Sequence, residues 1–254
     1  MLAIAGGKGG VGKTTTALGL AYARAAGDER TLIVDADRDM PDLHALARVE
    51  PRPTAAALVT ADNTGSAATD ATLSTVVQAV PDEHRVGVLP AAPGIERATM
   101  RRALRRLSCA PSAVVVDCPA GAGTDVADPL RLADGCVVVA RETPAGLRDG
   151  AKTAALSRAV DTPVVGGLVV GSRRETAARP PASVRRHLRR LLDAPTTTAP
   201  AVERPLSDPR VARARRRLLD ALPRSVWSTD PRQPLPGSRR RRARSRERDG
   251  ETTG

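Results

Sequence analysis

The sequence predicts an α/β fold: a doubly wound, mainly parallel sheet with helices on both faces. Short runs of β-branched residues alternate with longer segments rich in Ala, Leu and Arg, a pattern typical of strands and helices in parallel sheets. Because the chain has no Phe, one Trp and one Tyr, its core must be built from Val, Leu, Ile and Ala, which suits strands covered on both sides. With 254 residues, we expect one large domain with an extension.

The elements of this sheet follow one another in a regular order. Short apolar runs predict strands at residues 2–5, 31–36, 86–89, 113–117, 136–140 and 164–170. The segments between them predict helices at residues 14–26, 96–107, 126–132 and 146–160. Residues 60–82 are rich in Thr, Ala and Asp without a strong period, and we expect a surface helix with loops there.

Two further helices are predicted in the last third of the chain. In residues 182–194, arginines lie opposite an apolar stripe, which consists of Val184, His187, Leu188, Leu191 and Leu192. In residues 209–222, Asp208 is expected to cap the helix and Pro209 to take its first position. The composition changes to Pro, Ser, Arg and Gly after Trp227. We therefore expect a domain at residues 1–222 and a basic, disordered tail at residues 223–254.

The excess positive charge is confined to the last third. The net charge is +12, but residues 1–170 carry 18 basic and 19 acidic side chains, whereas residues 171–254 carry 22 and 9. A segregated basic region favours contact with nucleic acid, an anionic lipid surface or an acidic protein. A solvated extension without a partner is the alternative.

The cysteines and the apolar runs exclude several classes of protein. Cys109, Cys118 and Cys136 form no CxxC pair, so we expect reduced, buried thiols rather than a disulfide framework or a thiolate metal site. No apolar run is long enough for a signal peptide or a transmembrane segment. We expect a cytoplasmic protein, with peripheral association at the membrane or the nucleoid as an open alternative.

Residues 7–14 fit the spacing G-x-x-x-x-G-K-[ST] of a phosphate-binding loop. The motif follows a predicted strand and opens a predicted helix, which is the context that it requires. Backbone N–H groups and the positive end of the helix would bind phosphates, Lys13 would reach the β- and γ-phosphates, and Thr14 would contact Mg²⁺. The predicted nucleotide-binding residues are Gly7, Lys8, Gly9, Gly10, Val11, Gly12, Lys13, Thr14 and Thr15.

Three aspartates follow apolar strands that would end near this loop. Asp35 and Asp37 come at and after the end of the second predicted strand, at the carboxyl edge of the sheet where phosphates bind. Asp117 ends another apolar strand, which is the Walker B pattern, and would hold a water molecule bound to Mg²⁺. Helix capping or a turn is the alternative role of Asp35 and Asp37.

The loop also contains a second lysine that the general motif does not require. Lys8 and Lys13 lie in one short stretch, although Lys152 is the only other lysine of this arginine-rich chain. The sequence KGGVGKT resembles the deviant Walker A signature of the MinD/ParA family of P-loop ATPases, MinD-like and archaeal-type, whose fold is of the SIMIBI type. The resemblance implies that Lys8 reaches across a dimer interface to the partner's nucleotide, so that ATP joins two subunits in a homodimer.

Further motifs resemble the same family. Residues 32–37 look like its second motif, which implies that Asp37 positions or activates the attacking water and that Asp35 lies near the Mg²⁺ shell. Residues 114–121 resemble the family's hhhDxPAG pattern around Asp117. By resemblance, the catalytic residues are Lys8, Lys13 and Asp37, while Mg²⁺ is held directly by Thr14 and through water by Asp35 and Asp117.

The remaining similarity concerns the partner surface and the base. Residues 144–149 resemble a family loop used for dimer or partner contacts, with helix capping as the alternative role of Asp149. Residues 164–170 resemble the strand that leads to the adenine pocket, although Gly171, Ser172 and Arg173 replace the Asn of many members. No NKxD-like guanine signature occurs, which favours ATP. The resemblance extends over residues 1–222 and implies a last strand within residues 194–202, short or irregular because of its threonines.

We therefore predict an ATPase that slowly hydrolyses ATP to ADP and phosphate with Mg²⁺ and switches between a monomer and an ATP-bound dimer. One role offered by the family is control of the cell division site or of spatial positioning, through a regulatory protein or a membrane surface. A second is chromosome or plasmid partitioning, in which the Arg-rich C-terminal third binds DNA. A third, a metal-cluster carrier, needs paired cysteines, and the chain has no CxxC.

Overall fold

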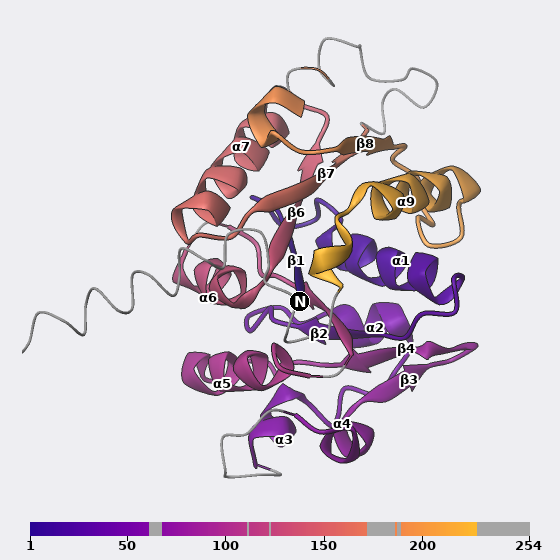
Figure 1. Ribbon diagram of the computed structural model, residues 1–254, viewed down its shortest axis with the longest axis vertical. Helices are drawn as coiled ribbons and strands as arrows, with labels where there is room; N and C mark the ends of the chain where they lie inside the picture. Colours follow the sequence, from indigo (N-terminus) through magenta and orange to yellow (C-terminus); the bar gives the residue numbers. More distant parts are fainter. Residues whose placement is uncertain (61–67, 111, 122, 172–185, 187–188, 228–254) are drawn as a thin grey trace, which may run out of the picture.

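One sheet organises the chain in the computed structural model, which describes residues 1–60, 68–110, 112–121, 123–171, 186 and 189–227 (Figure 1). Its strands lie in the order β3-β4-β2-β5-β1-β6-β7-β8. They are β1 Leu2–Ala5, β2 Thr31–Asp35, β3 Gln78–Val80, β4 Glu83–Leu89, β5 Ala113–Asp117, β6 Gly135–Arg141, β7 Val164–Val170 and β8 Thr196–Ala199. Neighbouring strands are parallel except β3 and β4. The predicted α/β fold is confirmed.

Helices cover both faces of this sheet, as predicted. Figure 1 shows α5, α6 and α7 on one face and α1, α2 and α9 on the other. The helices are α1 Lys13–Ala25, α2 Leu43–Ala47, α3 Ala55–Thr60, α4 Asp70–Val76, α5 Arg97–Leu107, α6 Thr124–Leu132, α7 Pro144–Ala159 and α9 Pro209–Ala221. In the part of the chain that the structure describes, none of them is long and apolar enough to cross a membrane.

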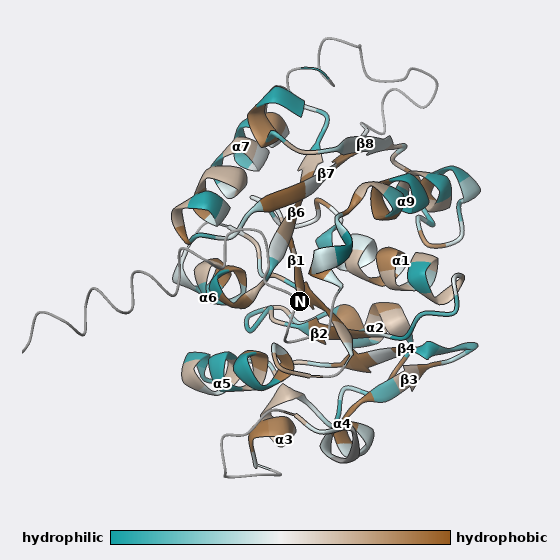
Figure 2. Cartoon of the chain, in the orientation of Figure 1, coloured by the Kyte–Doolittle hydropathy of each residue, from teal (hydrophilic) through white to brown (hydrophobic). Residues whose placement is uncertain are grey.

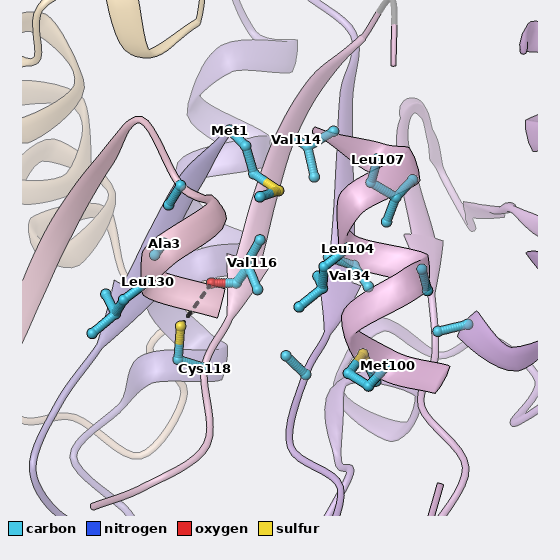
Figure 3. Packing of buried hydrophobic residues seen from close by; sticks show 14 of the residues in the cluster. Met1, Ala3, Val34, Met100, Leu104, Leu107, Val114, Val116, Cys118 and Leu130 are labelled. Atoms are coloured by element: carbon cyan, nitrogen blue, oxygen red, sulfur yellow. Dashed lines mark hydrogen bonds between the residues drawn. The ribbon is translucent and has the colours of Figure 1, made fainter. Parts of the chain in front are cut away.

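Strand side chains alternate between two apolar cores because successive residues of a strand point to opposite faces. On β1, Ala3 belongs to the core beneath α5 and α6, whereas Ile4 belongs to the core beneath α1 and α9. Figure 3 shows the first core, where Leu104 of α5 and Leu130 of α6 pack on the sheet. In the hydropathy colours of Figure 2, the sheet is largely brown, whereas α5 carries much teal.

The structure contains short elements that the sequence analysis missed. β3 is an antiparallel edge strand in the segment for which the sequence predicts only a surface helix with loops, and the helix there is α4. A three-residue edge strand is held by backbone pairing with β4 and needs no apolar period. α2 and α3 have five and six residues, which is too short for a helical period to be recognised.

Two finer predictions have different outcomes. The last strand, β8, is short and lies at the edge, as the resemblance implies. The prediction of buried thiols is correct for Cys118 and Cys136 but wrong for Cys109, which is exposed. Cys109 lies in the turn after α5, where the buried positions are taken by Leu107 and Ala110.

The C-terminal segment packs beside α1. Asp208 caps α9 as predicted, because its carboxylate accepts hydrogen bonds from the backbone N–H groups of Arg210 (2.8 Å) and Val211 (3.3 Å). A 3₁₀ turn, Arg224–Val226, then leads to Trp227, whose ring lies 4.1 Å from the guanidinium of Arg24. Packing therefore continues beyond residue 222. The tail from residue 228 lies outside the described residues, and its disorder stays a prediction.

The helix expected at residues 182–194 is described only in part. Leu192 is buried against the first core, whereas Leu191 is exposed and does not belong to a buried stripe. Val184, His187 and Leu188 lie outside the described residues, so the rest of the predicted stripe stays a prediction.

Candidate functional site

Residues 6–12 join β1 to α1 at the middle of the sheet. Because β1 lies between β5 and β6, this loop emerges beside the carboxyl ends of both strands, where ligands bind in open α/β sheets. Gly10 and Gly12 adopt left-handed conformations (φ 68° and 98°), which favour glycine. Gly12 directly precedes the first residue of α1. The predicted phosphate-binding loop therefore has the required context of strand, turn and helix N-terminus.

Two neighbouring elements hold the loop. At the end of β6, Arg141 donates a hydrogen bond from Nη2 to the carbonyl oxygen of Gly10 (2.6 Å). Gly7 lies against α7, where a Cβ on Gly7 would stand 2.6 Å from the Cβ of Asp149. Sequence reasoning missed Arg141, whose only signal is its place at the end of the strand beside β1.

Lys13 and Thr14 begin α1 and lie where the motif predicts. Lys13 is only 7% exposed, although its side chain ends in a charge. The Thr14 hydroxyl donates a hydrogen bond to Oδ1 of Asp42 (3.1 Å), which leaves the lone pairs of the hydroxyl oxygen available to a cation. Asp42 was not predicted as a site residue, because it belongs to no motif and the short helix that it precedes was not recognised in the sequence.

The carboxylates of Asp35 and Asp117 meet at the ends of two adjacent strands. β2 and β5 pair with Asp35 directly beside Asp117, and both residues are buried. Asp35 accepts hydrogen bonds from the backbone N–H groups of Asp37 (2.9 Å) and Leu43 (3.2 Å). Oδ1 of Asp117 has no hydrogen-bond partner among the described residues.

This pair of carboxylates is electrostatically unfavourable without a cation. Burial, with smaller contributions from the nearby Asp42 and Asp37, raises the pKa of Asp35 to about 7 against the opposing effect of its two backbone hydrogen bonds. Burial and the neighbouring Asp35 likewise hold the pKa of Asp117 well above its usual range, although Thr14 and Lys13 oppose this. Two buried like charges are a typical binding site for a positive ion.

The residues at this position fit Mg²⁺. The donors are a hydroxyl and carboxylates, which are the oxygen ligands that this hard cation takes. Asp117 offers a buried oxygen that no other described residue contacts by a hydrogen bond. Among the described residues, no group of three or more His, Cys, Asp or Glu side chains could hold a metal ion by itself. Such an arrangement suits an ion that shares its shell with phosphate oxygens and water.

Asp37 lies at the rim of this cluster. Its side chain is half-buried, and Oδ1 accepts hydrogen bonds from the backbone N–H groups of Asp39 (3.2 Å) and Met40 (3.1 Å). The carboxylate therefore closes a turn in the loop after β2, which is the alternative role that the sequence left open for Asp37. The other carboxylate oxygen, Oδ2, takes no part in these two bonds, so the turn is compatible with a catalytic role.

Lys8 lies on the exposed side of the loop, whereas Lys13 is buried. The Lys8 side chain is 69% exposed, and Nζ forms an ion pair with Oδ2 of Asp149 on α7 (3.4 Å). Asp149 is not the cap of that helix, because Thr143 is the N-cap and accepts a hydrogen bond from the N–H of Gly146 (3.0 Å). Lys8 is thus placed on the surface of the loop, where a second molecule can approach it.

A cavity of about 220 Å³ adjoins the loop on the side of β7 and β8. Its walls are largely apolar and include Val11, Val170 and Pro200, and its polar groups include Glu203 and Arg215. Arg215 is buried, donates from Nη1 to the carbonyl oxygen of Pro205 (2.9 Å), and has its pKa lowered to about 10 by burial. This space next to Gly12 and Thr15 suits a nucleotide base. Ser172 and Arg173 lie outside the described residues.

The structure thus brings together most of the predicted residues. Lys13, Thr14, Asp35 and Asp117 converge at the N-terminus of α1, with Asp37 at the rim and Lys8 on the surface. Arg141, Asp42 and Arg215 are additions that sequence reasoning did not identify, since each is placed by the fold rather than by a motif.

Comparison with known proteins gives a consistent result. The family model of the CobQ/CobB/MinD/ParA nucleotide binding domain matches residues 2–194. The uncharacterized ATP-binding protein MJ0547 of Methanocaldococcus jannaschii is 29% identical over 176 residues, which are 66% of this chain and 62% of that protein.

Solved structures resemble the fold. The cell division ATPase MinD of Pyrococcus furiosus gives a TM-score of 0.66 at 20% identity, over 87% of this chain and 96% of that one. The septum site-determining protein MinD of Pyrococcus horikoshii, complexed with Mg-ADP, gives a TM-score of 0.61 at 20% identity, over 91% of this chain and 89% of that one.

Proposed function

The chain belongs to the CobQ/CobB/MinD/ParA family of nucleotide-binding domains, and we propose that it is an ATPase that slowly converts ATP to ADP and phosphate. The observation that carries this proposal is the convergence of Lys13 and Thr14 with the buried carboxylates Asp35 and Asp117 at one helix N-terminus. A glycine-rich loop with these residue types is the machinery of phosphoryl transfer in P-loop proteins. The ATP-binding relative and the Mg-ADP complex of a structural neighbour support the choice of nucleotide.

Binding would depend on the loop and on Lys13. The backbone N–H groups of residues 7–15 and the positive end of α1 bind the phosphates. Lys13 places a buried ammonium beside the β- and γ-phosphates, where the low dielectric strengthens its attraction for their charge. The cavity beside Thr15 accommodates the base, with Arg215 as a hydrogen-bond donor in its wall.

Thr14, Asp35 and Asp117 would hold Mg²⁺, the first directly and the two carboxylates through water. When bound, this ion neutralises charge on the β- and γ-phosphate oxygens. A bound cation would compensate the negative charge of Asp35 and Asp117, whose pKa values are raised chiefly by burial, so the site suits the loaded state.

Hydrolysis would use Asp37 to orient the attacking water. The turn closed by Asp39 and Met40 holds one oxygen of this carboxylate and leaves the other for the water. A carboxylate that is partly exposed orients water less firmly than a buried one, which agrees with slow turnover.

Lys8 would contact the nucleotide that is bound to a second subunit. We assign its exposed ammonium to the nucleotide of a partner chain, so that ATP joins two monomers and hydrolysis releases them. Dimer formation must then break the ion pair with Asp149, which is a weak interaction for so exposed a pair.

Substitution of Lys13 tests the proposal. Titration of a fluorescent ATP analogue should show a loss of affinity of at least about 100-fold in Lys13→Ala, because a charge-assisted contact to phosphate is removed. Lys152→Ala is the matched control, since Lys152 is exposed on α7 and should leave affinity unchanged. Equal affinity in the two variants would refute the phosphate-binding assignment.

For the cellular role, we propose spatial regulation, such as placement of the division site, through an unidentified regulatory protein. The support is fold-level: neighbours include a cell division ATPase and a septum site-determining protein.

DNA segregation is the second candidate, favoured by the arginines on α9. Arg213 and Arg217 are exposed on the outer side of this helix, whereas Arg215 points inward. Arginine side chains in such a position fit DNA phosphates, and binding should then weaken steeply with salt. A salt-titrated DNA-binding assay with and without ATP separates the two candidates.

A further inference from the structure

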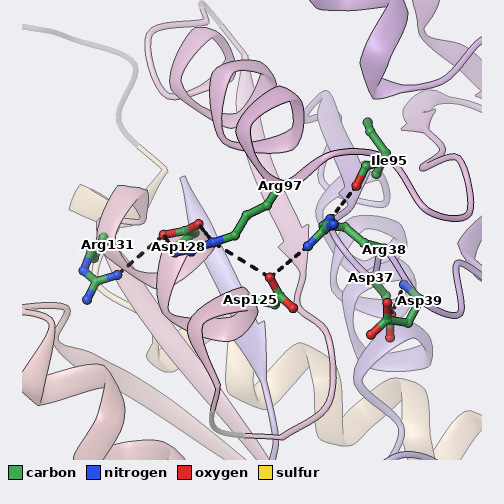
Figure 4. A network of polar contacts seen from close by, with 8 residues as sticks. All are labelled: Asp37, Arg38, Asp39, Ile95, Arg97, Asp125, Asp128 and Arg131. Carbon is green, nitrogen blue, oxygen red and sulfur yellow. Dashed lines mark hydrogen bonds and ion pairs between the residues drawn. The ribbon is translucent and has the colours of Figure 1, made fainter.

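A chain of ion pairs links the loop after β2 to α5 and α6 (Figure 4). Arg38 lies 3.0 Å, from Nη1 to Oδ1, from Asp125 of α6, and Nε of Arg97 lies 3.9 Å from the same carboxylate oxygen. Arg97 also forms two hydrogen bonds to Asp128, from Nε to Oδ2 (2.6 Å) and from Nη2 to Oδ1 (3.0 Å). Arg131 completes the series beside Asp128 (3.5 Å).

Arg38 is fixed to two other segments at three points. Besides the bond to Asp125, its Nε donates to the carbonyl oxygen of Ile95 (2.6 Å), and its own carbonyl oxygen accepts from the N–H of Gly94 (2.9 Å). The side chain is largely buried, being 22% exposed. A planar guanidinium can serve the carbonyl and the carboxylate at once, which a lysine cannot do in a fixed geometry.

Within the described part of the chain, the Asp37 carboxylate has no comparable contact with another segment. Its observed hydrogen bonds, from the N–H groups of Asp39 and Met40, lie within the same loop and set the shape of the turn, not its place in the molecule. The loop is tied to the rest of the site by Asp35 and by the bond from the N–H of Ala36 to the carbonyl oxygen of Asp117 (2.9 Å), both before Asp37. Beyond Asp37, Arg38 makes the first such contact in the chain, ahead of the hydrogen bonds of Asp42 and Leu43.

We propose that Arg38 is a positioning residue, which holds the Asp37 carboxylate in place through its contacts with Asp125 and the loop before α5. The inference rests on the proposed function, since it concerns the water-orienting role of Asp37. Asp125 and Arg97 would help to hold Arg38 in place. Changes of charge on α5 and α6 would then alter the rate of hydrolysis while nucleotide affinity stays constant.

The test separates rate from affinity. In steady-state hydrolysis, Arg38→Ala and Asp125→Asn should lower kcat by about 10- to 100-fold, because a small displacement of a catalytic group costs this much. Affinity for a non-hydrolysable ATP analogue should stay within about 2-fold of the parent protein, since the binding residues are untouched. Arg38→Lys should lie between the parent and Arg38→Ala. Arg102→Ala, an exposed arginine of α5, is the control and should change neither quantity.

A charge exchange distinguishes positioning from a general structural role. Arg38→Asp combined with Asp125→Arg should recover part of the kcat lost in either single variant. Unchanged kcat in Arg38→Ala, or an equal loss of kcat and analogue affinity, would overturn the inference.

Hydrogen exchange gives a readout that does not depend on hydrolysis. The amides of Asp39 and Met40 should exchange faster in Arg38→Ala than in Arg102→Ala, because the turn closed by Asp37 loses its anchor. Unchanged exchange would overturn the inference. If the parent protein binds ATP but does not hydrolyse it, the proposed function fails, while this measurement still decides whether Arg38 anchors the loop.

Discussion

The carboxyl edge of the sheet and the outer faces of α5 and α9 are both rich in charge, but they hold it differently. At the edge, Lys13, Asp35 and Asp117 are buried, and Oδ1 of Asp117 has no hydrogen-bond partner among the residues that the structure describes. On the helices, arginines such as Arg102 and Arg213 extend into solvent. Because burying an uncompensated charge is costly, the first arrangement indicates a charged ligand, whereas the second is compatible with many partners or with none.

Of the substitutions that test this difference between buried and exposed charges, Asp117→Asn should have the largest effect. Asp117→Asn should weaken binding of ATP in the presence of Mg²⁺ by about 10- to 100-fold, as loss of a metal-shell partner usually does. The measurement is calorimetric titration at fixed Mg²⁺ concentration. Without Mg²⁺, the variant and the parent protein should bind ATP alike, and a loss of equal size there would argue against the metal role.

The same substitution should stabilise the nucleotide-free protein as pH rises. Since the folded-state pKa of Asp117 lies above the unfolded value, its carboxyl contributes no penalty at low pH, and stability falls as pH rises from the unfolded pKa through the folded one. Asparagine does not ionise. The melting temperature of Asp117→Asn relative to the parent should therefore increase from pH 5 to pH 8.

The control for this pH series is Asp220→Asn on α9. Asp220 forms an exposed ion pair with Arg216, so the melting temperature of Asp220→Asn should stay close to that of the parent from pH 5 to pH 8. A melting-temperature difference for Asp117→Asn that is flat with pH would show that this carboxylate is not strained in the folded protein.

The packing of the loop at residues 6–12 against α7 predicts a loss of stability when Gly7 is replaced. Gly7→Ala should lower the free energy of unfolding by about 1–3 kcal/mol, because a Cβ would overlap Asp149, including its backbone. Gly9→Ala is the matched variant, since its Cβ would meet nothing within 4 Å. Denaturant unfolding without nucleotide compares the two. Equal losses would mean that α7 does not confine the loop.

A similar loss is expected when the chain is shortened at its C-terminal edge. A chain that ends at Leu222 should be less stable than one that ends at Trp227 by about 1.5–3 kcal/mol, the gain from burying one side chain such as Val226. Thermal unfolding of the two chains makes the comparison. Identical stability would place the end of the domain at residue 222, as the sequence predicts.

The smallest effect on stability belongs to the outer arginines. Arg213→Ala with Arg217→Ala should change the free energy of unfolding by less than about 0.5 kcal/mol, as usual for surface sites. If α9 contacts DNA, the same variant should reduce the dependence of binding on salt by roughly one to two released ions. A large loss of stability would show that these arginines belong to the fold.

The position of a candidate site residue in the fold could be predicted where a motif needs one residue type at one spacing. Gly12, Lys13 and Asp117 are of this kind, because phosphate and metal chemistry tolerates few substitutes and the flanking strands are strongly apolar. The central strands were predictable for the same reason, since buried parallel strands are continuous runs of Val, Leu and Ile.

What could not be predicted depends on contacts between distant segments. Arg141 reaches Gly10 from a strand more than a hundred residues away, and Arg38 reaches Asp125 across the sheet edge. Neither arginine stands out in a chain so rich in arginine. β3 was missed because its backbone pairing, not its side chains, makes it a strand.

The central claim is that a loop with two lysines makes ATP a switch for dimer formation, and light scattering tests it most directly. With the hydrolysis-impaired variant Asp37→Ala, the account predicts about twice the monomer mass with ATP and Mg²⁺ and the monomer mass with ADP. Adding Lys8→Ala should give monomers that still bind ATP. A mass that ignores the nucleotide, or dimers that persist without Lys8, would contradict the account.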